Sequence, residues 1–377
     1  MKKRVRIVSI GIVLIILIGI IVMSANSNNK YSFTQDGIKY ALTLDGNKVT
    51  SFPSKGMYKV QVTCEGADGR WLYNDWKLAI ENITGDISCD IDFSTINKTN
   101  LNDFIISLSG TTQGTGKVVN EKGYRYEGKN PNNYIWFNNE YWRMIGVFDS
   151  ASHGVSGQNL VKIIRADVLD GLAWDKSNTN DWTAASLKSL LNGAYYNAQD
   201  GTSSGYCYGY STIATGNCDY TKKGIQSGYR GMIANVTWYL GGYSTSDGTT
   251  ESFYEYERGT TVYSGRPTRT TVYIGLMYPS DYGYSVLSSS CARTTNLSSY
   301  STATCAGQSW LYGKGHEWTL TPNSSNSTNV FWGNYSGKLS YGGATTGTNF
   351  RPVLYLDASV YKIDGDGSLE NPYIIGM

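Results

Sequence analysis

Residues 134–148, YIWFNNEYWRMIGVF, contain the pattern from which the architecture of most of this chain can be built. Two runs rich in aromatic and branched side chains, 134–137 and 141–148, flank the polar residues 138–140. Such runs on either side of a short polar turn are typical of a β-hairpin. We therefore expect the larger, C-terminal part of the chain, 128–377, to start with this hairpin.

The residues that follow predict further strands and two helices. Residues 160–165 predict a strand, and apolar residues at helical spacing predict helices over 181–191 and 225–240. Later strands are predicted at 271–277, 329–334, 351–357 and 360–363. Early helices followed by a late sheet are typical of an α+β domain, the fold class that we expect for 128–377.

The late strands also carry a resemblance. The motifs WTLTP at 318–322, NVFW at 329–332, GKL at 337–339 and RPVLYL at 351–356, with 133–148 and 274–284, resemble uncharacterised surface and phage-associated proteins of Firmicutes. The resemblance implies a C-type-lectin-like, formylglycine-generating-enzyme-like domain but no particular activity, because one fold hosts many functions. The calcium motifs of C-type lectins are missing, and Cys291 and Cys305 lie too far from the C-terminus to match the enzyme's reactive cysteines.

Residues 30–97 predict a separate, small β-domain. Apolar and polar residues alternate strictly along 58–64, 76–81 and 89–93, which is typical of strands with one buried face. Cys64 and Cys89 are in phase with the apolar residues, so we expect them to bridge two strands across the core of an immunoglobulin-like β-sandwich. Residues 98–127, rich in Gly, Thr and Asn, predict a linker with a short helix near 101–108.

The N-terminal segment, 1–29, predicts a basic cytoplasmic tip and a membrane anchor. Four basic residues precede an uncharged run from 7 to 23, which is about long enough to cross a bilayer as a single helix. A cleaved signal peptide, giving a secreted protein, is the alternative. Both hypotheses place the C-terminal domains outside the cell, at its surface or beyond it.

Cysteine content agrees with export. The chain has six cysteines and no Cys-x-x-Cys pair, which argues against a zinc site of the usual kind. An even number of cysteines in an oxidising compartment predicts disulfides. Pairing of neighbours is the simplest of the 15 arrangements that six cysteines allow. It joins Cys64 to Cys89, Cys207 to Cys218 and Cys291 to Cys305.

Charge excludes one class of partner. The chain has 32 Lys and Arg against 30 Asp and Glu, and without the four basic residues of the N-terminal tip the balance is close to −2. Nucleic-acid-binding proteins carry a concentrated basic face, so we expect no nucleic-acid partner. Tyr outnumbers Phe by 31 to 9, and such side chains bury a ring while keeping one end in water.

The sequence offers weak candidates for metal binding and catalysis. Asp364, Asp366 and Glu370 place oxygens at alternate positions, but the spacing is not that of an EF-hand, and we favour an ordinary turn over calcium. His316 next to Glu317, and His153, lie in glycine-containing loops without an obvious nucleophile. We therefore predict no catalytic residues, metal or cofactor.

A binding role is the favoured hypothesis. Aromatic side chains of the late segment, Trp310, Tyr312, Trp332 and Tyr335, are the candidate ligand face, although Trp310 and Trp332 are equally suited to a core. We expect a non-catalytic, membrane-anchored adhesion protein that presents its C-terminal domain to a glycan or a surface protein. An extracellular enzyme acting on polysaccharide, or a structural protein of the cell envelope, are the alternatives.

Overall fold

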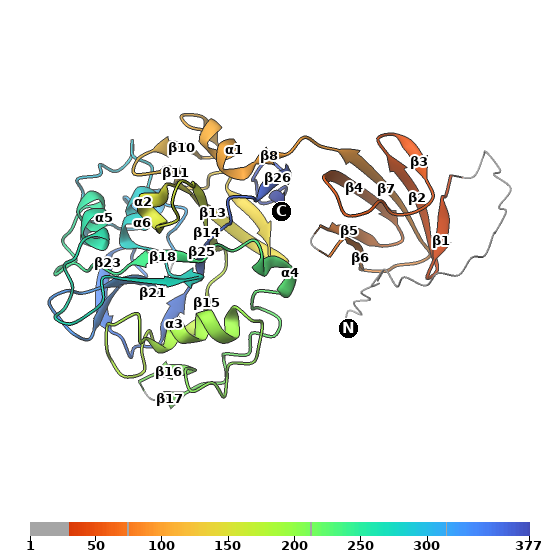
Figure 1. Ribbon diagram of the computed structural model, residues 1–377. Coiled ribbons are helices and arrows are strands. Elements are labelled where there is room, and N and C mark those ends of the chain that lie inside the picture. Colours follow the sequence, from red (N-terminus) through yellow and green to blue (C-terminus); the bar gives the residue numbers. More distant parts are fainter. Residues whose placement is uncertain (1–29, 74, 212, 314) are drawn as a thin grey trace. The chain divides into compact units, whose positions relative to one another are not determined.

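The computed structural model describes residues 30–377 except 74, 212 and 314, and the chain divides into two compact units. Unit 1 ends at Lys98 and unit 2 begins at Thr99 (Figure 1). Of the described residues, 38% lie in strands and 13% in helices. The predicted α+β fold class is therefore wrong, and the C-type-lectin-like α+β domain expected for 128–377 is a mostly β unit.

The anchor segment 1–29, with its predicted transmembrane helix over 7–23, lies outside the described residues. Within the described part, no helix combines the length and the apolar character that a membrane crossing requires. The transmembrane helix in the predicted fold class therefore has no support from the described residues.

Unit 1 is a five-stranded mixed sheet with a two-stranded ribbon. The sheet runs in the order β1-β2-β7-β4, with β3 on β2, and β5 pairs with β6. The strands are β1 (Phe33–Gln35), β2 (Ile38–Leu44), β3 (Asn47–Val49), β4 (Tyr58–Glu65), β5 (Asp68–Leu72), β6 (Lys77–Glu81) and β7 (Ile87–Thr95). Its core holds Tyr40, Trp71 and Phe93.

The disulfide of unit 1 differs from the predicted one in where it lies. Cys64 and Cys89 are directly opposite each other on the neighbouring strands β4 and β7, with their Cα atoms 4.1 Å apart. The bridge therefore joins two strands of one sheet and does not cross between two sheets, which corrects the immunoglobulin-like interpretation. Gly69 of β5 leaves room for the bridge, because a Cβ atom there would lie 2.3 Å from the Cys64 sulfur.

Unit 2 contains two large sheets. The first has eleven strands, in the order β20-β25-β14-β13-β12-β27-β26-β8 with β11, β10 and β9 branching from β13, and the second has the order β15-β24-β21-β22-β23. Strands of the first are β8 (Thr99–Asn100), β9 (Thr112–Gln113), β10 (Gly116–Asn120), β11 (Tyr124–Gly128), β12 (Tyr134–Phe137), β13 (Glu140–Phe148), β14 (Leu160–Arg165), β20 (Ile274–Gly275), β25 (Val353–Tyr355), β26 (Tyr361–Asp364) and β27 (Tyr373–Gly376). Strands of the second are β15 (Leu169–Leu172), β21 (Glu317–Pro322), β22 (Asn329–Gly333), β23 (Leu339–Gly343) and β24 (Thr348–Phe350).

Two small ribbons and several short helices complete unit 2. The ribbons pair β16 (Tyr208–Tyr210) with β17 (Ile213–Ala214) and β18 (Val236–Tyr239) with β19 (Arg269–Val272). The α-helices are α1 (Leu101–Ser107), α2 (Ser150–His153), α3 (Ser186–Leu190), α4 (Ser227–Arg230), α5 (Thr250–Arg258) and α6 (Pro279–Tyr284). A π-helical turn covers Leu191–Tyr195, and 3-10 turns cover Leu297–Ser299 and Ala306–Gln308.

The predicted hairpin is confirmed as the pair β12–β13. Phe137 is opposite Glu140, and the two-residue turn between them places Asn138 and Asn139 at φ 58° and 60°. Asparagine tolerates this left-handed conformation, and the resulting turn matches the twist of the two strands. The hairpin lies inside the first sheet, with β14 on one side of it and β27 on the other.

The long helices predicted over 181–191 and 225–240 are much shorter in the structure. Asp181 accepts a hydrogen bond from the Thr183 amide, as in an Asx turn, and α3 begins five residues after it. In the second segment α4 has only four residues, and Val236–Tyr239 is a strand. Branched and aromatic side chains favour a strand at that position over a helix.

Residues 98–127, predicted as a linker, contribute α1 and strands β8 to β11 to unit 2. Asn100 caps α1 by accepting hydrogen bonds from the amides of Asn102 and Asp103. The glycines that suggested a linker occupy turns and close contacts. A Cβ atom at Gly116 would lie 2.0 Å from the carbonyl oxygen of Glu127 on β11.

All three predicted disulfide pairings are confirmed. Cys207 joins Cys218 and Cys291 joins Cys305 within unit 2, with Cα–Cα distances of 6.0 and 5.4 Å. Each closes a short loop of the chain, so each acts within a local segment.

Candidate functional site

A cavity of about 530 Å³ opens in unit 2 beside the β12–β13 hairpin. Its size is within the usual range of ligand-binding pockets, roughly 300–1,000 Å³. Aromatic rings and two arginines line it, together with a short loop after β14. The lining residues are Tyr134, Tyr141, Arg143, Ala166, Asp167, Val168, Trp310, Tyr312, Gly313, Arg351 and Leu369.

The hairpin places three of these side chains on one face of the sheet. Tyr134 is the cross-strand partner of Arg143, and Tyr141 precedes Arg143 by two residues on β13. Directly opposite residues, and residues two apart on a strand, project to the same side. The rings of Tyr134 and Tyr141 meet edge to face, with their centroids 6.1 Å apart.

Arg143 is held between two aromatic rings. Its guanidinium carbon lies 4.2 Å from the ring centroid of Tyr134 and 4.6 Å from that of Trp310. Nε donates to Asn133 Oδ1 at 2.8 Å, and Nη2 donates to Asn130 Oδ1 at 3.1 Å and to the Pro131 carbonyl at 3.2 Å. Every one of these acceptors is neutral, and within residues 30–377 as described no carboxylate forms an ion pair with Arg143.

Arg351 is bound to a carboxylate. Its Nε lies 2.6 Å from Glu317 Oε1 and its Nη2 lies 3.0 Å from Glu317 Oε2, a two-point contact in which both side chains are buried. Nη2 also donates to the Leu311 carbonyl at 2.6 Å. Burial and, less strongly, the nearby charge of Arg351 lower the pKa of the Arg143 guanidinium to about 10. Arg143 therefore stays charged at neutral pH.

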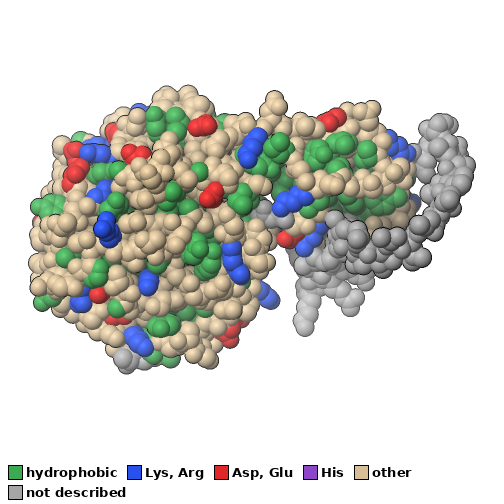
Figure 2. Space-filling model, in the orientation of Figure 1, with side chains coloured by type: hydrophobic (Ala, Val, Ile, Leu, Met, Phe, Trp, Pro, Cys, Tyr) green, Lys and Arg blue, Asp and Glu red, His purple; other side chains and the backbone are tan. Residues whose placement is uncertain are grey.

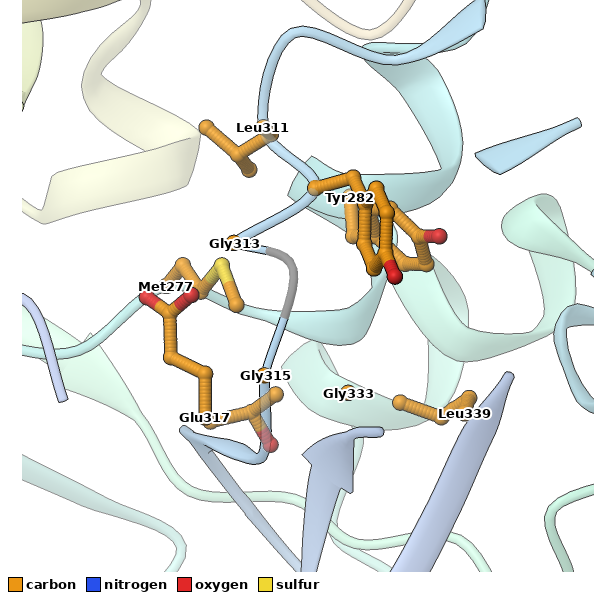
Figure 3. A pocket seen from close by; sticks show the side chains of 10 residues that line it. Met277, Tyr282, Leu311, Gly313, Gly315, Glu317, Gly333 and Leu339 are labelled. Carbon is orange, nitrogen blue, oxygen red and sulfur yellow. The ribbon is translucent and has the colours of Figure 1, made fainter. Parts of the chain in front are cut away.

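A second, much smaller pocket lies on the other side of the segment 311–313. Tyr312 and Gly313 line both spaces, while Met277, Tyr282 and Glu317 line only the second (Figure 3). It offers about 10 Å³, close to the space of one water molecule. The larger cavity is therefore the candidate ligand site. Gly313 is needed here, because a Cβ atom would lie 2.2 Å from Glu317 Oε2.

The four aromatic residues predicted as a ligand face fall into two groups. Trp310 and Tyr312 line the cavity, and the Trp310 indole donates to the Tyr126 carbonyl at 2.8 Å. Trp332 and Tyr335 do not line it. They pack around His316, with ring centroids 5.2 and 5.6 Å from the imidazole. The two groups meet where the Tyr312 hydroxyl donates to the Tyr335 carbonyl.

The histidines and the acidic turn have structural surroundings. His153 is buried, its Nε2 lies 3.1 Å from the Phe148 carbonyl, and burial lowers its pKa. Glu317, next to His316, is committed to Arg351. Asp366 accepts from the Ser368 amide at 2.9 Å, as in a turn. Among the residues placed by the structure, no group of three or more potential metal ligands comes together.

Tyr134, Tyr141, Arg143 and Arg351 were not predicted as site residues. One signal was present in the sequence: Arg143 lies within an apolar strand, and a charged residue at such a position needs a partner or a function. Arg351 precedes Pro352 at the start of a predicted strand and carries no comparable signal.

A second cluster of charges is sealed in the core of unit 2. Asp281, at the start of α6, lies 3.0 Å from Arg125 Nη1 and 2.5 Å from Lys162 Nζ, and it accepts from the Tyr278 amide at 3.0 Å. Burial alone raises the pKa of Asp281, but the two positive charges outweigh it and lower the value to about 2. Burial lowers the pKa of Lys162 to about 8, against the opposing effect of Asp281.

Comparison with known proteins adds no relative. No family model matches the chain, and neither curated proteins nor solved structures gave a match. The resemblance to surface proteins of Firmicutes therefore stays a prediction.

Proposed function

We propose that this protein works outside the cytoplasm as a non-catalytic binding protein, and that the cavity beside the β12–β13 hairpin takes a saccharide. The observation that carries the proposal is the cavity of about 530 Å³ with the rings of Tyr134, Tyr141, Trp310 and Tyr312 in its lining. Sugar rings present apolar C–H faces that pack on aromatic rings, and the tyrosine hydroxyls supply polar contacts.

The wall of the cavity is pre-organised, which favours binding. Trp310 is anchored by its indole hydrogen bond, and Tyr134 is packed against both Tyr141 and the Arg143 guanidinium. Side chains that are already ordered lose little conformational entropy when a ligand arrives. Half-buried rings beside a fully buried anchor are typical of residues that dominate binding energy.

Binding is favoured over hydrolysis by the state of the nearest carboxylates. Polysaccharide hydrolases use two carboxyl groups on either side of the bond that is cleaved. Here both oxygens of Glu317 are engaged by Arg351, and Asp167 is exposed at the rim of the cavity. Among the described lining residues, no pair of free carboxyl groups therefore faces the cavity.

The location outside the cytoplasm is supported by the disulfides. All six cysteines are paired, and such bridges persist in oxidising compartments. The charged side chains of both signs are scattered singly over the face seen in Figure 2, as on a protein that does not attach to nucleic acid.

A glycan array probed with the purified protein, alongside a polysaccharide hydrolysis screen, tests the proposal. We expect binding to a defined group of saccharides without turnover. Tyr141→Ala removes a cavity ring and should weaken that binding about tenfold or more. Tyr210→Ala, at a ring that is 60% exposed in the β16–β17 ribbon, is the matched control and should leave affinity unchanged. Turnover would favour the polysaccharide-acting enzyme, and a blank array would favour the structural protein.

A further inference from the structure

We propose that the saccharide bound in this cavity carries a carboxylate or phosphate group, and that this anion binds to Arg143 beside Arg351. The inference rests on the proposed function and narrows it to acidic saccharides.

The charge of Arg143 has no opposite charge beside it among the described residues. The side chain is 7% exposed, and its hydrogen bonds go to two asparagine oxygens and one carbonyl, all neutral. Removing a charge from water is costly unless an opposite charge or a full set of hydrogen bonds replaces the water. The rings of Tyr134 and Trp310 offset part of the cost by cation–π contact. An anion in the cavity would supply the missing opposite charge.

Both arginines of the cavity keep N–H donors that are not used within the described part of the protein. Among the described residues, Nη1 of Arg143 and Nη1 of Arg351 have no hydrogen-bond acceptor, although the other nitrogens of both groups do. Both residues line the cavity. Guanidinium groups bind carboxylate and phosphate oxygens through several N–H donors at once, and they remain charged where an amine would neutralise.

The glutamates around the cavity are paired with arginines other than Arg143. Glu317 matches Arg351, and Glu140 matches Arg165, whose Nη2 lies 2.6 Å from the carboxylate. Neither glutamate lines the cavity, and Asp167, the one acidic residue in the described lining, is exposed. The buried end of the cavity therefore keeps the positive charge of Arg143, enclosed by aromatic walls that weaken screening by water.

Ring-stacking walls and a buried guanidinium together define the ligand class. A sugar acid or sugar phosphate can place its ring against Tyr134, Tyr141 or Tyr312 and its anionic group against Arg143. A neutral saccharide could offer the arginine donors only hydroxyl oxygens, which accept hydrogen bonds but bring no charge to balance the guanidinium. The arrangement should therefore discriminate by charge more strongly than by the stereochemistry of single hydroxyls.

Calorimetric titration of the wild-type protein tests this without any mutation. The probes are trigalacturonate, its methyl ester, and the pair glucose 6-phosphate and glucose. We expect the free acid to bind at least tenfold more tightly than its ester if the anion is a carboxylate. If it is a phosphate, the same advantage should appear for glucose 6-phosphate over glucose. Equal affinities within both pairs would overturn the inference and leave the proposed function standing. Failure of every saccharide on the glycan array would overturn the proposed function itself.

Arg143→Gln then locates the effect. We expect it to lower affinity for the preferred anionic probe at least tenfold while changing that for its neutral partner less than threefold. Arg269→Gln, at an exposed position of β19, is the matched control and should change neither. Arg143→Lys keeps the charge without the planar fork and should fall between wild type and Arg143→Gln. If Arg143→Gln binds both members of the pair as the wild type does, Arg143 is not the anion site.

Discussion

The cluster around Asp281 and the cluster around Glu317 each combine two basic side chains with one carboxylate, but they distribute the bonds differently. Asp281 binds both of its cations, Arg125 and Lys162, and all three are buried. Glu317 gives both oxygens to Arg351, and Arg143 is left with neutral acceptors at the wall of a cavity. The charges around Asp281 are therefore balanced within the core, whereas Arg143 beside the cavity can still bind an anion.

The two clusters also differ in the type of basic residue: Lys162 belongs to the cluster around Asp281, and Arg143 to the cluster around Glu317. Lys162 is sealed from water, and burial lowers its pKa to about 8, so the amine holds its proton less firmly than an exposed lysine but is still mostly charged at pH 7. Arg143 keeps its charge near neutral pH even with its pKa lowered to about 10. The charge of Lys162 is already balanced by Asp281, whereas the charge of Arg143 beside the cavity remains available for an anion.

Breaking the sealed cluster should have the largest effect on stability. Asp281→Asn leaves Arg125 and Lys162 without their shared carboxylate, and loss of one partner of a buried ion pair costs about 3–5 kcal/mol. Urea unfolding, monitored by circular dichroism, measures this loss of unfolding free energy. Asp103→Asn, at an exposed position of α1, is the control and should stay within about 0.5 kcal/mol. A similar small loss for Asp281→Asn would show that the cluster does not stabilise the fold.

A second buried carboxyl group, Glu257, accepts hydrogen bonds from Ser280 next to Asp281 and should make the stability of the fold depend on pH. Burial raises the pKa of Glu257 to about 7 from 4.5, and the charge of Asp281 adds to that rise. A raised carboxyl pKa means that the folded state holds the proton more tightly. This contribution is fully present below pH 4.5 and is lost as pH rises through 7.

We therefore expect Glu257 to lower the unfolding free energy by about 3 kcal/mol between pH 4.5 and 7.5. Unfolding curves of wild type and Glu257→Gln across this range isolate the effect, because the variant cannot titrate there. Parallel profiles for the two proteins would mean that folding does not raise the pKa of Glu257.

Removing the carboxylate of Glu317 should lower the unfolding free energy less than removing that of Asp281. Glu317→Gln removes the charge opposite Arg351, but water in the adjoining cavity can solvate the guanidinium in part, so about 1–3 kcal/mol is expected. The measurement is the same urea unfolding used for Asp281→Asn. A loss equal to or larger than that of Asp281→Asn would contradict the distinction between a sealed and an open cluster.

The smallest effect is expected at the rim. Asp167→Asn removes an exposed carboxylate from the lining and should raise affinity for an acidic saccharide about twofold, since an exposed charge contributes only about 0.2–1 kcal/mol. Salt should diminish the difference between wild type and variant. Titrations of both proteins in low and high salt measure this difference in affinity. Weaker binding by the variant would mean that Asp167 contacts the ligand directly.

The local parts of this fold could be predicted from the sequence, and the distant pairings could not. Alternation and turn residues predicted the β12–β13 hairpin, and spacing predicted all three disulfides. The helices over 181–191 and 225–240 were overestimated, because an apolar period of 3.6 also arises where buried residues of short turns face one core. That excess of helix led to the wrong fold class.

The same limit applies to the site. Trp310 and Tyr312 were predicted as ligand residues from their chemistry alone. A charge within an apolar strand was a sequence signal for Arg143, but its contact with Trp310, 167 positions along the chain, appears only in the fold, as does the contact of Arg351 with Glu317. Contacts between such distant residues leave no periodic signal in one sequence.

A crystal structure of the protein with its preferred acidic saccharide tests the central claim most directly. The account predicts an anionic oxygen within about 2.7–2.9 Å of Arg143 Nη1, with a sugar ring against one of the tyrosines of the cavity. An empty cavity with the saccharide bound elsewhere, or an anion that avoids Arg143, would contradict the account.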